Sequence, residues 1–276
     1  MKKIYKTSII FIAITVFISC NSRQDQEKQA DMRLKHIEQL ISENELNAAK
    51  IEIDSIHSLF PRLVNKRRIA AALEDTVMML ESERTLAYCN KILPKKQHET
   101  DSIQRNFRFE KNKKYQDLGN YIYKTQQTES NTNRIYLKTY VDENADFYLV
   151  SNYCGGKIEQ SSVEVSANDI SAETKTISTS NASNHSFTDA GTRWEELTFK
   201  NEADNGVSAF IAQNATMRIK VTLHGKKSYV YYLTEPDKKA VIQTYHLWVV
   251  KRDVAQLQKE IKKAAFKIQR IKNGRK

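Results

Sequence analysis

The strongest structural signal in the chain lies in residues 234–276, with the sequence TEPDKKAVIQTYHLWVVKRDVAQLQKEIKKAAFKIQRIKNGRK. Thr234 is suited to cap a helix with its hydroxyl, Pro236 fits the first turn, and Asp237 complements the helix dipole. Beyond them the apolar residues alternate at three- and four-residue spacing: Leu247, Val250, Val254, Leu257, Ile261, Ala264, Ile268 and Ile271. This heptad seam predicts one long helix that buries its apolar stripe against a partner helix.

The partner helix is expected among residues 32–114, where apolar residues also follow helical spacing. A tight turn is predicted at residues 42–44, and a second helix from about Arg62 is expected to end at Pro94. These residues form a predicted helical hairpin. We therefore expect a coiled-coil-like stem within one chain, and a homodimer through the C-terminal helix is the alternative.

Residues 115–233 have a different character, because Gly, Ser, Thr and Asn cluster between short β-prone runs. This pattern predicts an antiparallel β-sandwich or barrel-like domain between the helical parts, and thus an α+β fold. A hairpin loop is expected at residues 224–227 and an exposed connection at residues 171–184. The predicted strands are 119–124, 134–141, 147–153, 162–166, 194–199, 209–212, 217–223 and 229–233.

The amino terminus has the three parts of an export signal. Lys2, Lys3 and Lys6 give a positive start, an apolar run follows over residues 8–17, and a small residue precedes Cys20. The apolar run is too short for a spanning helix, so residues 1–19 are predicted to be a cleaved signal peptide. The polar residues 20–31 that follow have the composition of a tether.

The end of this signal, Phe17-Ile18-Ser19-Cys20, resembles the lipobox of bacterial lipoproteins. The resemblance implies that Cys20 becomes the first residue and carries acyl chains such as palmitate, which together hold a protein on a membrane. Because Asn21 is not the aspartate that retains enteric lipoproteins at the inner membrane, the outer membrane is the expected location. An ordinary signal peptide and an uncleaved anchor helix are the alternatives.

The positive charge is concentrated at the carboxyl end. The formal net charge is +11, and residues 251–276 hold ten Lys or Arg against two acids, while residues 20–250 are neutral. Lys262, Lys263 and Lys267 are therefore candidates for contact with anionic lipid or lipopolysaccharide. The alternative is a solvated helix face whose lysines complement the helix dipole. A nucleic-acid partner is not expected in the cell envelope.

Aromatic residues of the β region are the other candidates for ligand contact. Tyr231, Tyr232 and Trp194 combine ring surface with a polar group, as residues in glycan and protein contacts do. In the run 229–233 the side chains alternate between two faces, so we expect at least one tyrosine to meet solvent. Tyrosine is also a favoured strand residue, and structural packing is the alternative.

No catalytic residue, metal site or cofactor site is predicted. The six histidines are scattered, and neither an HExxH zinc motif nor a GxSxG nucleophile motif is present. Apart from Cys20 the chain has Cys89 and Cys154, for which two free thiols are the preferred interpretation and a disulfide the alternative.

Several short segments resemble uncharacterised lipoproteins of Bacteroidota. They are AAKIEIDSI at 48–56, ERTLAYCNKIL at 83–93, YCGGK at 153–157 and LTEPDKKA at 233–240. The resemblance implies an envelope setting and short O-glycosylation motifs at Ser55, Thr76 and Ser102. We expect a non-catalytic lipoprotein whose β-domain binds a protein or glycan partner; lipid binding by the C-terminal helix and an enzyme of envelope polymers are the alternatives.

Overall fold

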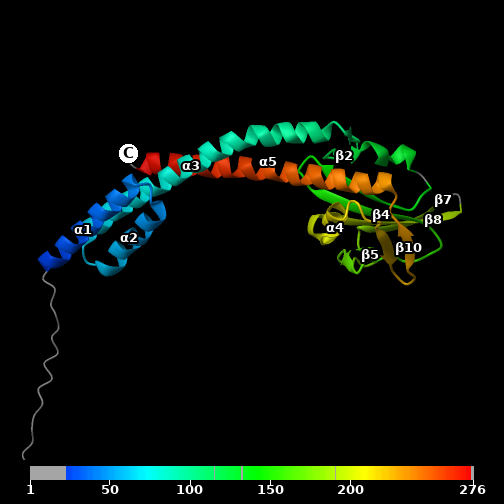
Figure 1. Cartoon of the computed structure of the whole chain (residues 1–276), viewed down its shortest axis with the longest axis horizontal. Helices are drawn as coiled ribbons and strands as arrows, with labels where there is room; N and C mark the ends of the chain where they lie inside the picture. The colour runs from blue at the N-terminus through cyan, green and yellow to red at the C-terminus, as the bar shows by residue number, and fades with distance from the viewer. Residues whose placement is uncertain (1–22, 115, 132, 190, 275–276) are drawn as a thin grey trace, which may run out of the picture. The chain divides into compact units, whose positions relative to one another are not determined.

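The structure is a computed structural model that describes residues 23–274 apart from residues 115, 132 and 190. Within these residues the fold is α+β, as predicted, and it comprises five α-helices and two antiparallel sheets (Figure 1). The chain divides into two compact units. One comprises the residues up to Arg84 together with those from Ala265 onward, and the other comprises Thr85–Ala264.

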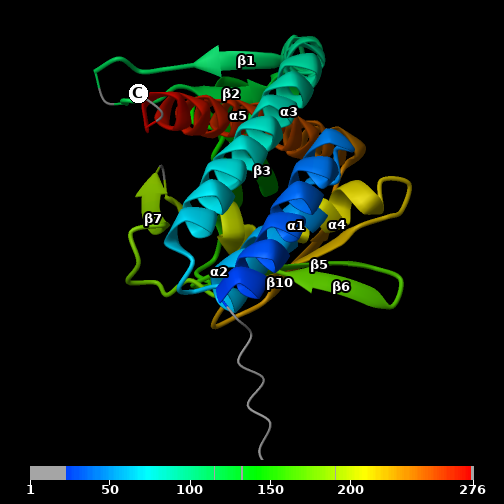
Figure 2. The ribbon, with the colours of Figure 1, turned by 90° about the vertical axis from the view of Figure 1, so that its left-hand side faces the viewer.

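The first unit is built on three helices that share an apolar cluster (Figure 2). They are α1 (Arg23–Ser42), α2 (Leu46–Leu59) and α3 (Val64–Gln104), whose second half belongs to the other unit. The turn predicted at residues 42–44 is confirmed, with Asn44 in the left-handed region at φ 70°. The cluster has the helical spacing seen in the sequence: Ala30, Leu34, Ile37, Leu46, Ala49, Ile53, Ile56, Phe60, Leu63, Ala70 and Val77.

Two predictions for this part of the chain are wrong. Residues 23–31, predicted as tether, are helical, and Ala30 is fully buried. The Arg, Gln, Glu and Lys residues that make this run polar are also good helix formers, and Ala30 packs in the apolar cluster of the unit while Asp31 pairs with Lys66 of α3. Pro94 does not end a helix but lies inside α3. A proline there removes one backbone hydrogen bond, and the long helical segments on both sides outweigh that loss.

The second unit contains both sheets, and every strand pair in them is antiparallel. The six-stranded sheet runs in the order β1 (Phe107–Glu110), β2 (Asn120–Tyr123), β3 (Tyr136–Asp142), β4 (Phe147–Gly155), β8 (Thr192–Lys200) and β7 (Asn184–Asp189). The four-stranded sheet runs in the order β10 (Tyr229–Tyr232), β9 (Lys220–His224), β5 (Ser162–Ala167) and β6 (Ile170–Glu173). Among the described residues, neither sheet closes into a barrel.

One apolar cluster joins the two sheets. Alternate residues of β3 and β4, such as Leu137 and Leu149, are fully buried in it. Val163 of β5 and Val221 of β9 contribute to the same cluster from the four-stranded sheet. Leu149, Val163 and Val221 each stand two residues from another core residue of the same strand, as expected where one face of a strand is buried.

The structure also corrects the strand assignment. Residues 209–212, predicted as a strand, belong to the helix α4 (Val207–Gln213). Val207 and Ile211 are both fully buried and stand four residues apart, which places them on one helical face. Strands β1, β6 and β7 were not predicted, because they are short and mostly polar or exposed.

The long C-terminal helix is confirmed as α5 (Glu235–Gly274). Its heptad seam is the least exposed side, with Leu247, Val250, Ala264 and Ile271 buried. In the second unit α5 is linked to α3 by an ion pair from Lys96 Nζ to the Asp253 carboxylate at 3.2 Å. No helix within the described residues has the length and apolar character needed to cross a bilayer.

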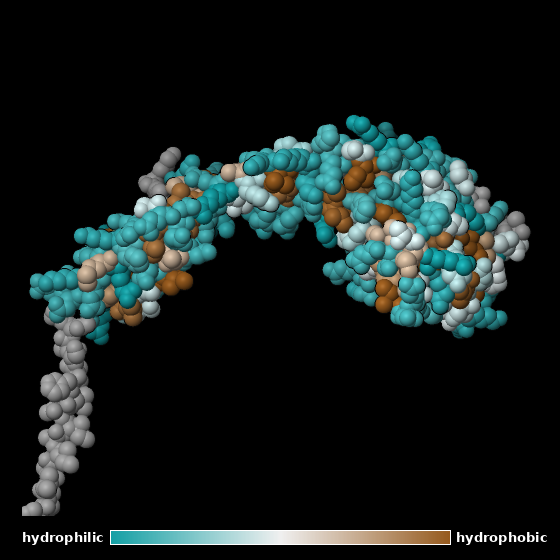
Figure 3. Space-filling model, viewed as in Figure 1, coloured by the Kyte–Doolittle hydropathy of each residue, from teal (hydrophilic) through white to brown (hydrophobic). Residues whose placement is uncertain are grey.

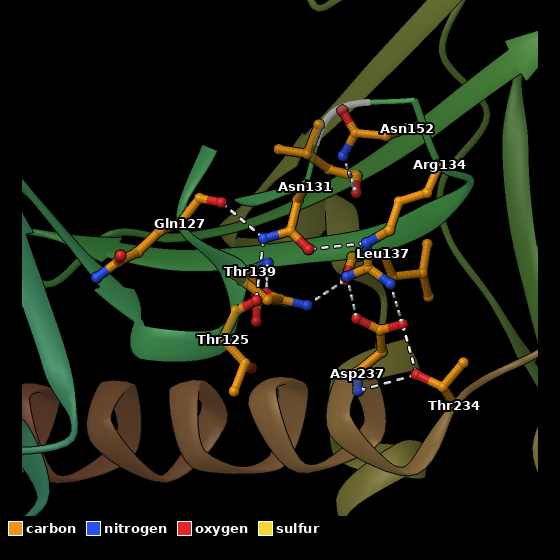
Figure 4. A network of polar contacts seen from close by, with 11 residues as sticks. Thr125, Gln127, Asn131, Arg134, Leu137, Thr139, Asn152, Thr234 and Asp237 are labelled. Carbon is orange, nitrogen blue, oxygen red and sulfur yellow. Dashed lines mark hydrogen bonds and ion pairs between the residues drawn. The ribbon is translucent and has the colours of Figure 1, made fainter. Parts of the chain in front are cut away.

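A polar network fixes the start of α5 to the edge of β3 (Figure 4). The Arg134 guanidinium donates to both carboxylate oxygens of Asp237, at 2.8 and 2.6 Å. Asn131 Oδ1 accepts the Nε–H of Arg134 at 2.7 Å. The Thr234 hydroxyl donates to Asp237 at 2.7 Å and accepts the backbone N–H of Asp237 at 3.3 Å, so the predicted capping residue is confirmed. The network joins segments that are far apart in the sequence.

Candidate functional site

The three aromatic residues predicted to contact a ligand do not form one site. Tyr231 and Tyr232 lie on β10 and Trp194 lies on β8, in the other sheet. The Tyr231 hydroxyl is buried and has no hydrogen-bond partner among the described residues, and burial raises the pKa of this phenol. Tyr232 is 46% exposed, as the alternation predicts for one tyrosine, and the Arg218 guanidinium lies 3.7 Å above its ring. Trp194 is half-buried and stacks on Phe187.

The lysines proposed for contact with anions lie on exposed parts of α5. Lys262, Lys263 and Lys267 are all exposed. Lys263 Nζ pairs with the Glu260 carboxylate on the same helix at 3.2 Å. This arrangement has the features of a solvated helix face, on which such pairs contribute little to stability.

The remaining predicted residues are placed as follows. Cys89 and Cys154 are free thiols, so the interpretation without a disulfide is confirmed, and burial raises the pKa of Cys154. The hydroxyls of Ser55 and Thr76 donate to backbone carbonyls one turn earlier, at 2.9 and 3.0 Å, while Ser102 is exposed. The signal and Cys20 lie outside the described residues.

A cavity of about 740 Å³ forms where α5, α4 and the β3–β4 turn meet, and sequence reasoning did not find it. The face of the protein that Figure 3 shows is mainly hydrophilic, with apolar residues in separate patches. The cavity is lined by Ala145, Asp146, Lys175, Asn201, Glu202, Asp204, Asn205, Gly206, Ala209, Tyr245, Trp248 and Arg252.

One wall of this cavity is aromatic. Tyr245 and Trp248 stand three residues apart on α5 and so share a helix face, with ring centroids 5.6 Å apart. Phe147 of the core lies 5.6 Å from the Trp248 ring and supports it. The Arg252 guanidinium lies 4.6 Å from the same ring, so the wall carries a cation at its rim.

The opposite wall is polar and tightly hydrogen-bonded. The Asn201 side chain accepts the backbone N–H of Phe147 and donates to Asp146, both at 2.7 Å. Lys200 Nζ lies 2.6 Å from the other Asp146 oxygen. Lys200 and then Asn201 hold the pKa of Asp146 below its usual value. This carboxylate is therefore ionised and fixed in place.

Asp204 occupies the buried end of the polar wall. It accepts the hydroxyl of Ser208 at 2.8 Å and the backbone N–H of Ser208 at 3.2 Å. Burial raises the pKa of Asp204, although these hydrogen bonds oppose the shift. Asp204 thus stabilises the first turn of α4 rather than offering a second free charge.

Left-handed backbone conformations gather around the cavity. Ala145, Asn201, Asn205 and Gly206 have φ values of 64°, 46°, 48° and 89°. For a residue with a side chain this conformation costs about 1–2 kcal/mol, and asparagine tolerates it best. The surrounding hydrogen bonds hold these residues in place, so the cavity wall is rigid rather than an ordinary loop.

Three charged side chains at the cavity have no ion-pair partner among the residues that the structure describes. They are Lys175, Arg252 and Glu202, and all three are exposed. By contrast, the charge of Asp146 is balanced by Lys200. Among the exposed side chains of the described lining, two are therefore cationic and one is anionic.

A second cavity, of about 690 Å³, lies beside β1 and β2 and suits a small ligand less well. Its lining is mostly charged or amide side chains, including Arg108, Glu110, Lys113 and Lys138. Phe109 is the single aromatic residue in its described lining. Because binding sites usually combine apolar surface with a few polar groups, we take the cavity beside Trp248 as the candidate site.

Comparison with protein-family models, with curated proteins and with solved structures finds no match to this chain. The function must therefore be argued from the cavity and its residues. One signal in the sequence could have indicated its aromatic wall: Tyr245 and Trp248 are bulky aromatics within a helix whose exposed side is otherwise rich in lysine.

Proposed function

We propose that this protein is a lipid-anchored, non-catalytic binding protein of the cell envelope, and that the cavity beside Trp248 binds a glycan. The observation that carries the proposal is the pairing of an aromatic wall with a rigid polar wall. Sugars present an apolar C–H face that packs on aromatic rings, and a ring of hydroxyls that need hydrogen-bond partners. A cavity of about 740 Å³ lies within the size range of small-ligand sites.

The carboxylates of the cavity favour binding over catalysis. Asp146 is bonded to Lys200 and Asn201, and Asp204 is bonded to Ser208. Both therefore hold the wall in shape, and Glu202 is the one exposed carboxyl group in the described lining. A glycosidase needs two carboxyl groups free to face the scissile bond. A concave site also suits a glycan better than the broad surface of a protein partner.

The two tryptophans of the chain allow a direct test. Because the chain contains 2 tryptophans, a Trp194→Phe variant reports the fluorescence of Trp248 alone. Titrating this variant with a panel of oligosaccharides should change its emission. In the native background, Trp248→Ala should weaken binding tenfold or more, since a central aromatic contact contributes about 2 kcal/mol or more.

The matched control is Trp194→Ala, which removes the other indole from β8, outside the cavity. It should bind the same glycans with unchanged affinity. If Trp248→Ala binds as well as the native protein, or if Trp194 is the residue required, the proposed site is wrong. Calorimetry on each variant, together with its circular dichroism spectrum, separates loss of binding from loss of folding.

We further propose that lipid on Cys20 anchors the protein and that α3 and α5 form a coiled-coil stem within one chain. The lipobox-like sequence before Cys20 supports the anchor. The Lys96–Asp253 ion pair supports pairing within the chain. The envelope location and the relation to lipoproteins of Bacteroidota are parts of the same proposal.

The anchor is tested by a Cys20→Ala variant. It should incorporate no radiolabelled palmitate and should move from the membrane to the soluble fraction, because the acyl chains supply the membrane affinity. The control is Cys154→Ala, which should keep both the label and the membrane location. A Cys20→Ala protein that is still labelled would contradict the proposal.

A further inference from the structure

The charges around the Trp248 cavity narrow the class of glycan that it suits. Lys175 and Arg252 stand at the cavity without an ion-pair partner among the described residues, and Glu202 is the single exposed acid beside them. The other two carboxylates are less available to a ligand. Asp146 lies 2.6 Å from Lys200, and Asp204 is buried with its oxygens bonded to Ser208.

Arg252 is held in a suitable geometry for an anionic ligand. Its guanidinium lies 4.6 Å from the Trp248 ring centroid, so stacking restricts a side chain that would otherwise be mobile. A planar guanidinium can donate two parallel N–H bonds to a carboxylate or a sulfate. Stacked on the indole, it places those donors next to the aromatic wall of the cavity.

We propose that the cavity selects a sugar that carries a negatively charged group, a carboxylate as in a uronic acid or a sulfate ester. Arg252 binds the anionic group, Lys175 adds positive charge at the rim, and Trp248 with Tyr245 packs against the sugar ring. Glu202 disfavours the anion and so moderates the affinity. This inference rests on the proposed function, because it names the ligand class of the same site.

Removal of the charges should alter selectivity in a defined way. Arg252→Gln should lower the affinity for an acidic oligosaccharide by roughly tenfold to a hundredfold, the usual range for a hydrogen bond to a charged group. Its affinity for the neutral counterpart should change little. Lys175→Gln should give a smaller loss of the same kind, and Glu202→Gln should raise the affinity for the acidic ligand.

The experiment measures dissociation constants of the full mature chain, in detergent, for matched pairs of oligosaccharides. One pair is an oligoglucuronide and the same oligosaccharide with its carboxyl groups reduced, and the other is a sulfated oligosaccharide and its desulfated form. The acidic member should bind at least tenfold more tightly at low salt. The preference should shrink toward 1 M salt, where charges are screened over about 3 Å. Comparison of the two acidic oligosaccharides then shows whether the site selects a carboxylate or a sulfate ester, since the preferred one should bind more tightly.

The control is Lys262→Gln, which removes an exposed lysine of α5 outside the cavity lining and should leave all constants unchanged. Equal binding of acidic and neutral members would overturn the inference and leave the proposed glycan site standing. An acidic preference that survives both Arg252→Gln and Lys175→Gln would also overturn it. If no member of either pair binds, the inference and the proposed function are both wrong.

Discussion

Arg134→Ala is expected to lower the free energy of unfolding by about 3 kcal/mol, because it leaves the Asp237 carboxylate without its cation in a nearly buried position. The Asp237 side chain is 4% exposed and Arg134 is 33% exposed. The loss of stability should lie at the low end of the range for variants that break a buried ion pair, since water can reach part of the site. Urea unfolding, followed by both circular dichroism and tryptophan fluorescence, measures it.

Two further variants make this test specific. Lys263→Ala removes an ion pair whose members are 55% and 34% exposed, and should change stability by no more than about 0.5 kcal/mol. The Arg134→Ala, Asp237→Ala double variant should be less destabilised than the sum of the single variants, because each removes the same interaction. An Arg134→Ala protein as stable as the Lys263→Ala control would show that the network does not hold α5 in place.

Glu195→Ala should have an effect of similar size. This carboxylate is 2% exposed and accepts the backbone N–H groups of Ile158, Glu159 and Gln160, at 3.1, 3.1 and 2.9 Å. Truncation leaves three donors at the start of the segment before β5 without their acceptor. Each unsatisfied buried group costs about 1–3 kcal/mol, so a total near 3 kcal/mol is expected after water reaches the more accessible ones.

The contribution of Glu195 should also depend on pH. Burial raises the pKa of Glu195, but the hydrogen bonds from the backbone and from Arg193 outweigh it and leave the pKa below its ordinary value. A carboxyl group with a lowered folded-state pKa stabilises the protein above its unfolded pKa of about 4.3, and this is lost as pH falls through the folded value. The stability difference between native protein and Glu195→Gln should therefore be full at pH 7 and shrink in acid.

The matched control for this pH dependence is Glu202→Gln, which alters an exposed carboxyl group. Its stability difference from the native protein should be small at every pH. If the difference between the native protein and Glu195→Gln is the same at pH 7 and pH 3, the carboxylate is not stabilised by the surrounding N–H groups.

The sequence predicts the parts of the fold that repeat a local pattern. The heptad seam from Leu247 to Ile271 predicts α5, and Thr234 predicts its start. Short β-prone runs between clusters of Gly, Ser, Thr and Asn predict the central strands β3 and β4. Such patterns act over a few residues, so they can be recognised without knowledge of the tertiary structure.

The features that the sequence did not predict depend on contacts between segments that are far apart in the chain. Strand β7 has the sequence NHSFTD, with little β propensity, and forms because β8 offers it a partner. The cavity brings together Asp146, Asn201 and Trp248, and no local pattern in the sequence indicates that these residues lie close together. Tyr231, Tyr232 and Trp194 are predicted as ligand contacts from their residue type alone. The structure places them in two different sheets.

The first compact unit has a consequence for how the chain matures. It is assembled from residues up to Arg84 and from Ala265 onward, so its parts are separated in the sequence by the whole of the second unit. Ile271 is buried and is synthesised after residues 85–264, so the first unit cannot be completed before the second unit has been synthesised. A product terminated before residue 265 would lack this segment and would expose apolar surface of the first unit to proteases and chaperones.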